Sequence, residues 1–226
     1  MWQRRIRWVV AVVAVFLVAC VHADRPVRKT LPEEDWHEYV VYRIDDHRYI
    51  SIRSPQICNG HLDGNIYYND TQSGVRKFVS FTGPMRNGLY QGYYAVRTDP
   101  MHIAIPAISF SQIRGMMLRI YYSHDGGRSF QGFSVGPYSG EDNVVLLNGN
   151  DLYIARRNPM RPEDYSRSPG VVYDIDKDMD RRVAFSAAPP TAFDKYGKGV
   201  YRYQVPFDLK SPSGETRWTC PIAIDK

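Results

Sequence analysis

Alternating apolar and polar positions run through most of the chain and predict short β-strands rather than helices. In the clearest stretch, Leu118, Ile120 and Tyr122 occupy every second position, so a strand there has two distinct faces. Asp125-Gly126-Gly127 follows with residues that tolerate positive φ, and the chain then returns through Phe130. This pattern predicts a β-hairpin.

Further strand patterns recur about every 8 to 12 residues, separated by turn residues. They cover 38–44, 47–52, 65–70, 75–81, 88–96, 102–105, 143–147, 152–155, 171–173, 183–185, 200–205 and 217–220. No segment after residue 20 shows the period of an amphipathic helix. We therefore expect a single all-β domain over 36–226, either an antiparallel β-sandwich or a partial β-propeller-like architecture.

The first 20 residues follow a different pattern. Arg4-Arg5-Ile6-Arg7 precedes an apolar run from Trp8 to Ala19, which is short for a membrane span and typical of a signal segment. The run ends at Leu17-Val18-Ala19-Cys20, which resembles the lipobox of bacterial lipoproteins.

That resemblance implies that Cys20 is lipidated and becomes the first residue of the mature protein. Val21, rather than Asp, stands behind it and suits transfer to the outer membrane. Simple secretion with cleavage after Ala23 is the alternative. Residues 21–35 are polar, contain Pro26 and Pro32, and read as a flexible tether.

Composition adds two limits. The 43% of apolar residues and the 17 tyrosines favour a globular sheet protein over a disordered one. The formal charge of +5 falls to +2 once Arg4, Arg5 and Arg7 leave with the signal segment, so nothing indicates nucleic acid as a partner.

Cys58 and Cys220 are the cysteines that remain besides Cys20. In an exported protein we expect them to form a disulfide that joins an early strand to the last one. Two inert thiols are the alternative. No His or Cys stands at metal-ligand spacing to either residue.

The predicted hairpin also carries a motif. Ser123-x-Asp125-x-Gly127-x-Ser129-Phe130 resembles the Asp-box of sialidases and other β-propeller proteins. The resemblance implies a structural role, in which the polar side chains bond turn backbone and the aromatic ring packs inward.

Two patterns mimic catalytic or metal sites. Gly132-Phe133-Ser134-Val135-Gly136 matches a lipase nucleophile elbow, but Pro137-Tyr138-Ser139-Gly140 follows where an elbow needs a helix, so we assign no catalytic residue. Asp174, Asp176, Asp178 and Asp180 could surround a hard cation such as calcium, but the glycine and distal glutamate of an EF-hand loop are missing. A solvated turn is the favoured interpretation, and we expect no metal and no cofactor.

Between Arg156 and Gly170 the periodicity disappears. Long loops of this kind are disproportionately functional, and Tyr and Arg are enriched at binding hot spots. We therefore predict Arg161, Tyr165 and Arg167 as partner-binding residues, with a solvated loop as the alternative.

Four stretches together resemble a family of Gram-negative lipoproteins: 42–49, 66–71, 122–130 and 211–220. The family comprises the periplasmic immunity proteins that neutralise type VI secretion phospholipase effectors (Tli-like). The resemblance implies an inhibitor without enzymatic activity, held at the outer membrane by its lipid, whose partner is a cognate phospholipase effector. A glycan- or peptidoglycan-binding surface lipoprotein module is the alternative function.

Overall fold

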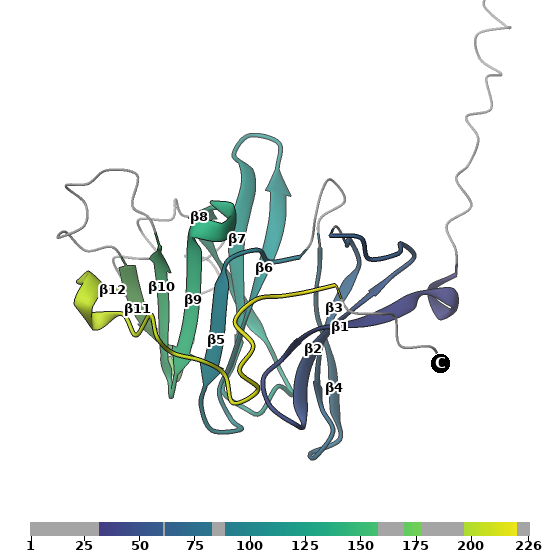
Figure 1. Cartoon of the computed structure of the whole chain (residues 1–226), viewed down its shortest axis with the longest axis horizontal. Coiled ribbons are helices and arrows are strands. Elements are labelled where there is room, and N and C mark those ends of the chain that lie inside the picture. The colour runs from purple at the N-terminus through teal and green to yellow at the C-terminus, as the bar shows by residue number, and fades with distance from the viewer. Residues whose placement is uncertain (1–31, 61, 83–88, 158–169, 178–196, 221–226) are drawn as a thin grey trace, which may run out of the picture. The chain divides into compact units, whose positions relative to one another are not determined.

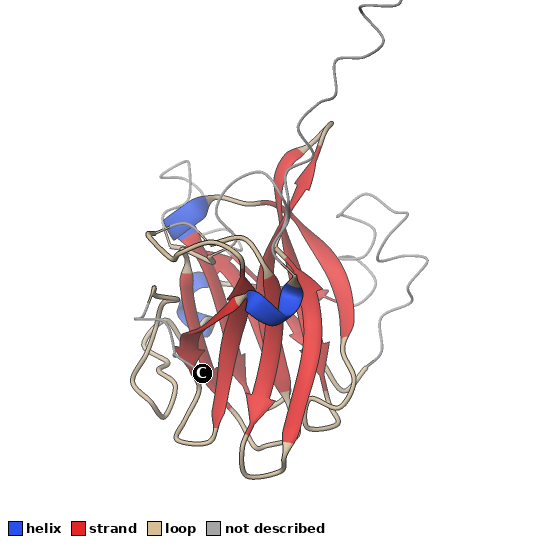
Figure 2. Ribbon diagram, turned by 90° about the vertical axis from the view of Figure 1, so that its right-hand side faces the viewer, coloured by secondary structure: helices blue, strands red, loops and turns tan. Residues whose placement is uncertain are grey.

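The computed structural model describes residues 32–60, 62–82, 89–157, 170–177 and 197–220. The chain divides into two units, Met1–Pro32 and Glu33–Lys226. In the described part of the second unit, strands are joined by loops and by the 3-10 helices η1 (Glu33–Asp35), η2 (Gly140–Asp142) and η4 (Arg202–Gln204), as Figure 2 shows. None of the described helices is long and apolar enough to cross a membrane. The predicted all-β class is confirmed.

The described strands form three sheets (Figure 1). Sheet A has the order β1 (His37–Arg43), β2 (Arg48–Ser54), β3 (Asn65–Asp70), β4 (Val75–Phe81). Sheet C has the order β6 (Ile103–Ser111), β7 (Gly115–Ser123), β8 (Gln131–Pro137). Sheet B has the order β12 (Gly197–Val200), β11 (Gly170–Asp174), β10 (Asp151–Arg156), β9 (Asn143–Asn148), β5 (Tyr93–Arg97). Sheets A and C are antiparallel throughout.

Aspartates close the turns of sheet A. Asp45 Oδ1 accepts the backbone N–H groups of His47 and Arg48 at 2.9 and 2.7 Å, between β1 and β2. Asp70 Oδ1 likewise accepts the N–H groups of Gln72 and Ser73, between β3 and β4. Such bonds satisfy donors that a tight turn leaves unpaired, which is why these two connections are short.

The pairing of β5 with β9 departs from the antiparallel expectation. These strands run parallel, with Tyr93 opposite Val144 and Arg97 opposite Asn148. The whole of sheet C lies between them in sequence, so the chain returns to sheet B as a crossover rather than as a hairpin. The backbone just before β5 lies very close to the start of β9. A Cβ on Gly92 would collide with the carbonyl oxygen of Asn143, so this close approach requires glycine.

One hydrophobic core contains residues of all three sheets. Its fully buried members include Tyr42, Ile50 and Tyr68 from sheet A, Ile120, Tyr122 and Phe133 from sheet C, and Tyr94, Val145 and Leu147 from sheet B. Several of these are tyrosines, so the core contains hydroxyl groups that need hydrogen-bond partners.

A second apolar cluster covers the other face of sheet B. Val200, Val205 and Leu209 pack there on strand residues such as Ala95 and Leu146. Val200 ends β12, and Val205 and Leu209 belong to the C-terminal segment (residues 201–220). Figure 1 shows this segment in yellow, running from the β12 side toward β1. Strand β9 is therefore buried on both faces, which explains its continuous apolar sequence.

A buried hydrogen-bond cluster around Tyr42 Oη joins the C-terminal segment to sheets A and B. Tyr42 Oη lies 2.6 Å from Ser211 Oγ, 2.9 Å from the carbonyl oxygen of Glu215 and 3.0 Å from that of Tyr94. Ser211 Oγ in turn accepts the backbone N–H of Val96 at 2.8 Å. Strands β1 and β5 thus meet through a serine that lies more than a hundred residues further along the chain.

The predicted disulfide is present, with a Cα–Cα distance of 5.6 Å between Cys58 and Cys220. It does not join two strands, as we had expected. Cys58 lies in the loop after β2, and Cys220 lies in an irregular stretch that contacts β1 through the backbone bond from Thr219 N–H to the Val41 oxygen.

Two strands expected near the C-terminus are also absent. Strand β12 ends at Val200, and η4 follows because Gln204 Oε1 accepts the N–H of Tyr201 at 2.8 Å. Pro206 then lacks the N–H that a ladder requires. Residues 217–220 are likewise irregular, and the expected strand at 183–185 lies outside the described residues.

Candidate functional site

The turn between β7 and β8 holds the polar residues of the sequence motif in mutual contact. Ser123 Oγ donates to Asp125 Oδ1 at 2.7 Å and accepts the backbone N–H of Gly127 at 2.9 Å. Asp125 Oδ1 also accepts the backbone N–H of Ser129 at 3.0 Å, and Oδ2 accepts its hydroxyl. All of these bonds remain within the turn, so they close the hairpin.

The same turn packs against sheet A. The Phe130 ring lies edge-on to the Tyr68 ring, with centroids 5.9 Å apart. Gly127 has a φ of +80°, and a Cβ there would collide with the Tyr68 ring, so this position requires glycine for both reasons. The N–H of Gly126 donates to the carbonyl oxygen of Met101 at 3.0 Å, which connects the turn to the loop before β6.

The environment of Asp125 favours its ionised form. Partial burial raises the pKa of the carboxyl, but the two hydrogen bonds from Ser129 and the one from Ser123 outweigh it and hold the pKa at about 2. The carboxylate therefore stays charged over the whole physiological range and keeps its acceptor role.

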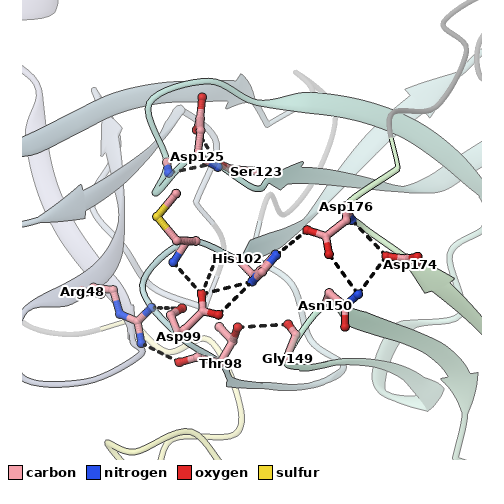
Figure 3. A network of polar contacts seen from close by, with 12 residues as sticks. Arg48, Thr98, Asp99, His102, Ser123, Asp125, Gly149, Asn150, Asp174 and Asp176 are labelled. Carbon is pink, nitrogen blue, oxygen red and sulfur yellow. Dashed lines mark hydrogen bonds and ion pairs between the residues drawn. The ribbon is translucent and has the colours of Figure 1, made fainter.

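Close to this turn, His102 lies between two carboxylates (Figure 3). Its Nδ1 is 3.1 Å from Asp99 Oδ1, and its Nε2 is 2.7 Å from Asp176 Oδ1. Asp99 and His102 belong to the connection between β5 and β6, whereas Asp176 follows β11. The imidazole thus bridges two segments that are far apart in sequence.

Neighbouring polar groups extend this bridge. Asn150 Nδ2 donates to Asp174 Oδ1 at 2.9 Å and to Asp176 Oδ2 at 3.1 Å. On the other side, Arg48 Nη1 donates to the carbonyl oxygen of Asp99 at 3.0 Å. The network, drawn in Figure 3, therefore runs from β2 of sheet A to the end of β11 in sheet B.

The two carboxylates favour the protonated form of His102. Partial burial lowers its pKa, but the hydrogen bond to Asp176 and the charge and hydrogen bond of Asp99 outweigh burial and raise the pKa above its ordinary value. An imidazolium donates from both ring nitrogens, which matches two carboxylate acceptors. His102, Asp99 and Asp176 together join two loops, and we call this arrangement the His102 clamp. Its groups bond one another rather than face a substrate as an acid–base pair.

The predicted aspartate cluster is only partly described. Asp174 accepts Lys177 Nζ at 2.8 Å, so that pair resembles the solvated turn we favoured. Asp178 and Asp180 lie outside the described residues. Within the described ranges, no group of three or more His, Cys, Asp or Glu side chains is arranged to hold a metal ion.

Ser134 lies in the middle of β8, opposite Arg119 of β7. The strand continues to Pro137, and the short η2 begins only at Gly140. A nucleophile elbow requires a sharp turn from strand to helix at the serine, and this geometry is absent around Ser134.

Sequence reasoning missed a group of aromatic and basic side chains, exposed or half-buried, on sheet A. We call it the β4 face and define it as Tyr67, Arg76, Phe78 and Phe81. The Phe78 and Phe81 rings lie 4.8 Å apart, and the Tyr67 ring lies 5.7 Å from Phe78. One signal was available in the sequence: Arg76 and Phe78 share the strand face that should be solvated, and a phenylalanine there is unexpected.

The missed His102 network also had a local signal. Asp99 and His102 stand three residues apart across a proline-containing turn, and Asp99 Oδ1 accepts the backbone N–H of Met101 at 2.8 Å. The contact with Asp176 spans 74 residues, and no local pattern indicates it.

The remaining predicted site residues cannot be placed. Arg161, Tyr165 and Arg167, predicted to bind a partner, and Cys20, predicted to carry the lipid, all lie outside the described residues.

A comparison with protein families matches the T6SS Tli3 immunity protein model to residues 35–156. The chain belongs to this family. No curated protein matches the chain.

The matched region runs from the last residue of η1 to the last residue of β10. It therefore contains all of sheets A and C, the 123–130 turn and the β4 face. The C-terminal segment, with Ser211 and Cys220, lies beyond it. Members of the family are immunity proteins of the type VI secretion system, so the chain has an immunity role that implies a cognate effector as its partner.

Replacing Asp125 with alanine should destabilise the protein by about 1–3 kcal/mol, because the hydroxyl of the buried Ser123 and the N–H and hydroxyl of Ser129 lose their acceptor. Urea denaturation of the mature protein measures this loss. Asp46→Ala, an exposed aspartate in the β1–β2 turn, is the matched control and should change stability by less than about 0.5 kcal/mol. Unchanged stability of Asp125→Ala together with lost effector binding would show that the turn is a binding site instead.

Replacing His102 with glutamine should remove a pH-dependent part of the stability, worth about 1 kcal/mol for a partly exposed pair. Because the pKa of His102 is raised in the folded state, its contribution is fully present below the unfolded pKa and is lost as the pH rises through the folded pKa. The stability difference between wild type and His102→Gln should therefore be largest below the ordinary histidine pKa of 6.5 and shrink as the pH rises above it. His47→Gln serves as the control, and a difference that stays constant with pH contradicts the clamp.

Proposed function

We propose that this protein binds and inhibits a type VI secretion phospholipase effector in the periplasm and has no catalytic activity of its own. The family match over residues 35–156 is the observation that carries the proposal. A stoichiometric inhibitor needs a rigid complementary surface but neither a nucleophile nor a cofactor.

The geometry supports inhibition better than hydrolysis. The serine of the one lipase-like pentapeptide lies within strand β8 and lacks the strand–turn–helix context of a nucleophile elbow. The described polar networks, around Asp125 and His102, connect segments of the fold to one another. Their bonds stabilise loops, as a scaffold for binding requires.

The signal segment and Cys20 support a location at the outer membrane, facing the periplasm. An effector that attacks membrane lipid there meets a tethered inhibitor at high local concentration, which strengthens protection without new contacts. Cys20→Ser should release the protein into the soluble periplasmic fraction, because one lipidated cysteine supplies the anchor. Wild-type protein found soluble, with a mature N-terminus at Asp24, would contradict lipidation.

The loop residues Arg161, Tyr165 and Arg167 remain predicted contacts with the effector. They lie outside the region that the family model matches. Contacts there would therefore set the specificity for one effector rather than the function that family members share.

Purified mature domain should abolish phospholipase activity of the effector at a one-to-one molar ratio. A lipase encoded by an adjacent gene is the effector to test, and the release of fatty acid from phospholipid vesicles is the signal to measure. A sharp stoichiometric endpoint is expected, since tight inhibitors titrate their targets.

The domain alone should release no fatty acid, and Ser134→Ala should inhibit as well as wild type. Undiminished effector activity at excess domain contradicts the proposal. In that case, binding of the domain to peptidoglycan or glycan would instead favour a surface-binding lipoprotein module.

A further inference from the structure

The β4 face exposes apolar rings at the end of a sheet. Strand β4 is the terminal strand of sheet A, and 39% of Phe78 and 67% of Phe81 are exposed. Clustered rings on a terminal strand invite association with another chain, and proteins usually avoid them unless a partner covers them.

A polar network holds this face rigid. Arg76 Nη1 donates to Glu38 Oε1 at 2.7 Å and to Asn69 Oδ1 at 2.8 Å, and Nη2 donates to Glu38 Oε2 at 3.0 Å. The guanidinium also lies 4.4 Å from the centroid of the Tyr67 ring. Each of these contacts restricts Arg76 before any partner arrives, so little side-chain entropy remains to be lost on binding.

The network crosses the whole sheet. Ser51 Oγ of β2 donates to Glu38 Oε1 of β1 at 2.7 Å, and Asn69 Nδ2 of β3 donates to Ser51 Oγ at 2.9 Å. With Arg76, one side chain from each of the four strands takes part. A row of this kind fixes the strands relative to one another, so the rings of the β4 face keep a constant arrangement.

The charges of this surface indicate the chemistry of its partner. Of the two exposed charged residues of β4, Arg76 shares the face of the rings, whereas Lys77 stands opposite the buried Tyr68 and so belongs to the other face of the strand. Two carboxylates lie beside the rings: Glu38, 18% exposed, pairs with Arg76, which is 42% exposed, and Glu33, 51% exposed, accepts the Tyr67 hydroxyl at 3.3 Å. The surface therefore offers apolar rings with an exposed arginine at one side and an exposed glutamate at the other, which complements an apolar surface bordered by one acidic and one basic group.

We propose that the β4 face is the docking surface for the cognate effector, which presents an apolar patch bordered by an acidic group opposite Arg76 and a basic group opposite Glu33. The proposal rests on the effector binding proposed above and adds its location. Tyr, Phe and Arg are the types that dominate interface cores, and here they are pre-organised. The family match contains the whole β4 face and excludes the 158–169 loop, so a docking surface common to the family is expected on the former.

The double variant Phe78→Ala with Phe81→Ala tests this location. Its dissociation constant for the purified effector, measured by isothermal titration calorimetry, should rise at least about 100-fold, because truncating two central anchors costs much of an interface's affinity. Phe110→Ala with Ile113→Ala is the matched control, since these exposed apolar residues lie on the β6–β7 hairpin instead. The control should change the constant by less than about threefold.

Glu33→Lys is a second variant that leaves the rings in place. Reversal of an exposed charge should weaken binding about tenfold at low salt, and the difference from wild type should fall as sodium chloride screens the charges. Equal thermal unfolding of all variants and wild type verifies that the fold is intact.

The outcomes separate this inference from the proposed function. Wild-type binding that both the double variant and Glu33→Lys leave unchanged overturns the docking surface but preserves the immunity proposal. Wild-type protein that fails to bind the effector at all overturns both. If sedimentation shows a wild-type dimer that the double variant dissociates while effector affinity is kept, the β4 face binds a second copy of this chain, and the proposal is wrong.

Discussion

The buried hydroxyl of Tyr42 is the interaction on which the arrangement of the sheets depends. It lies within hydrogen-bond distance of Ser211, Glu215 and Tyr94, and so joins β1, β5 and the C-terminal segment. An unsatisfied hydroxyl at this depth would cost about 1–3 kcal/mol, which is a large share of a domain's stability. The C-terminal segment must therefore return to the core before the fold is complete. The disulfide between Cys58 and Cys220 reinforces this return. It links residues 162 positions apart and so lowers the conformational entropy of the unfolded chain.

The inhibition proposed here needs a stable surface rather than a reactive group, and the polar networks meet that need. The Asp125 turn fixes the end of the β7–β8 hairpin, and the His102 clamp joins the β5–β6 loop to the end of β11. The row from Glu38 to Arg76 fixes sheet A. These groups use their hydrogen-bonding capacity within the fold. The rings of the β4 face remain exposed beside them, as a preformed contact surface requires.

Much of the fold could be predicted from the sequence, because period-two patterns and turn residues are local signals. The β7–β8 hairpin, the sheet A hairpins and the β9–β10 pair all follow from such patterns. The parallel pairing of β5 with β9 could not be predicted, since periodicity defines strands but not their partners. The irregular path after Val200 depends on burial against sheet B, which is a tertiary effect. For the same reason the contact of His102 with Asp176 was missed, while the Ser123 to Phe130 motif was visible in a single short stretch.

The central claim is that a rigid sheet A presents its β4 face to the effector. Hydrogen–deuterium exchange of the mature protein, free and saturated with effector, tests this most directly, because amides that become covered at an interface exchange more slowly. We predict that protection on binding is greatest for the amides of residues 75–81. Unchanged exchange over 75–81, with new protection confined to residues 158–169, would contradict the account.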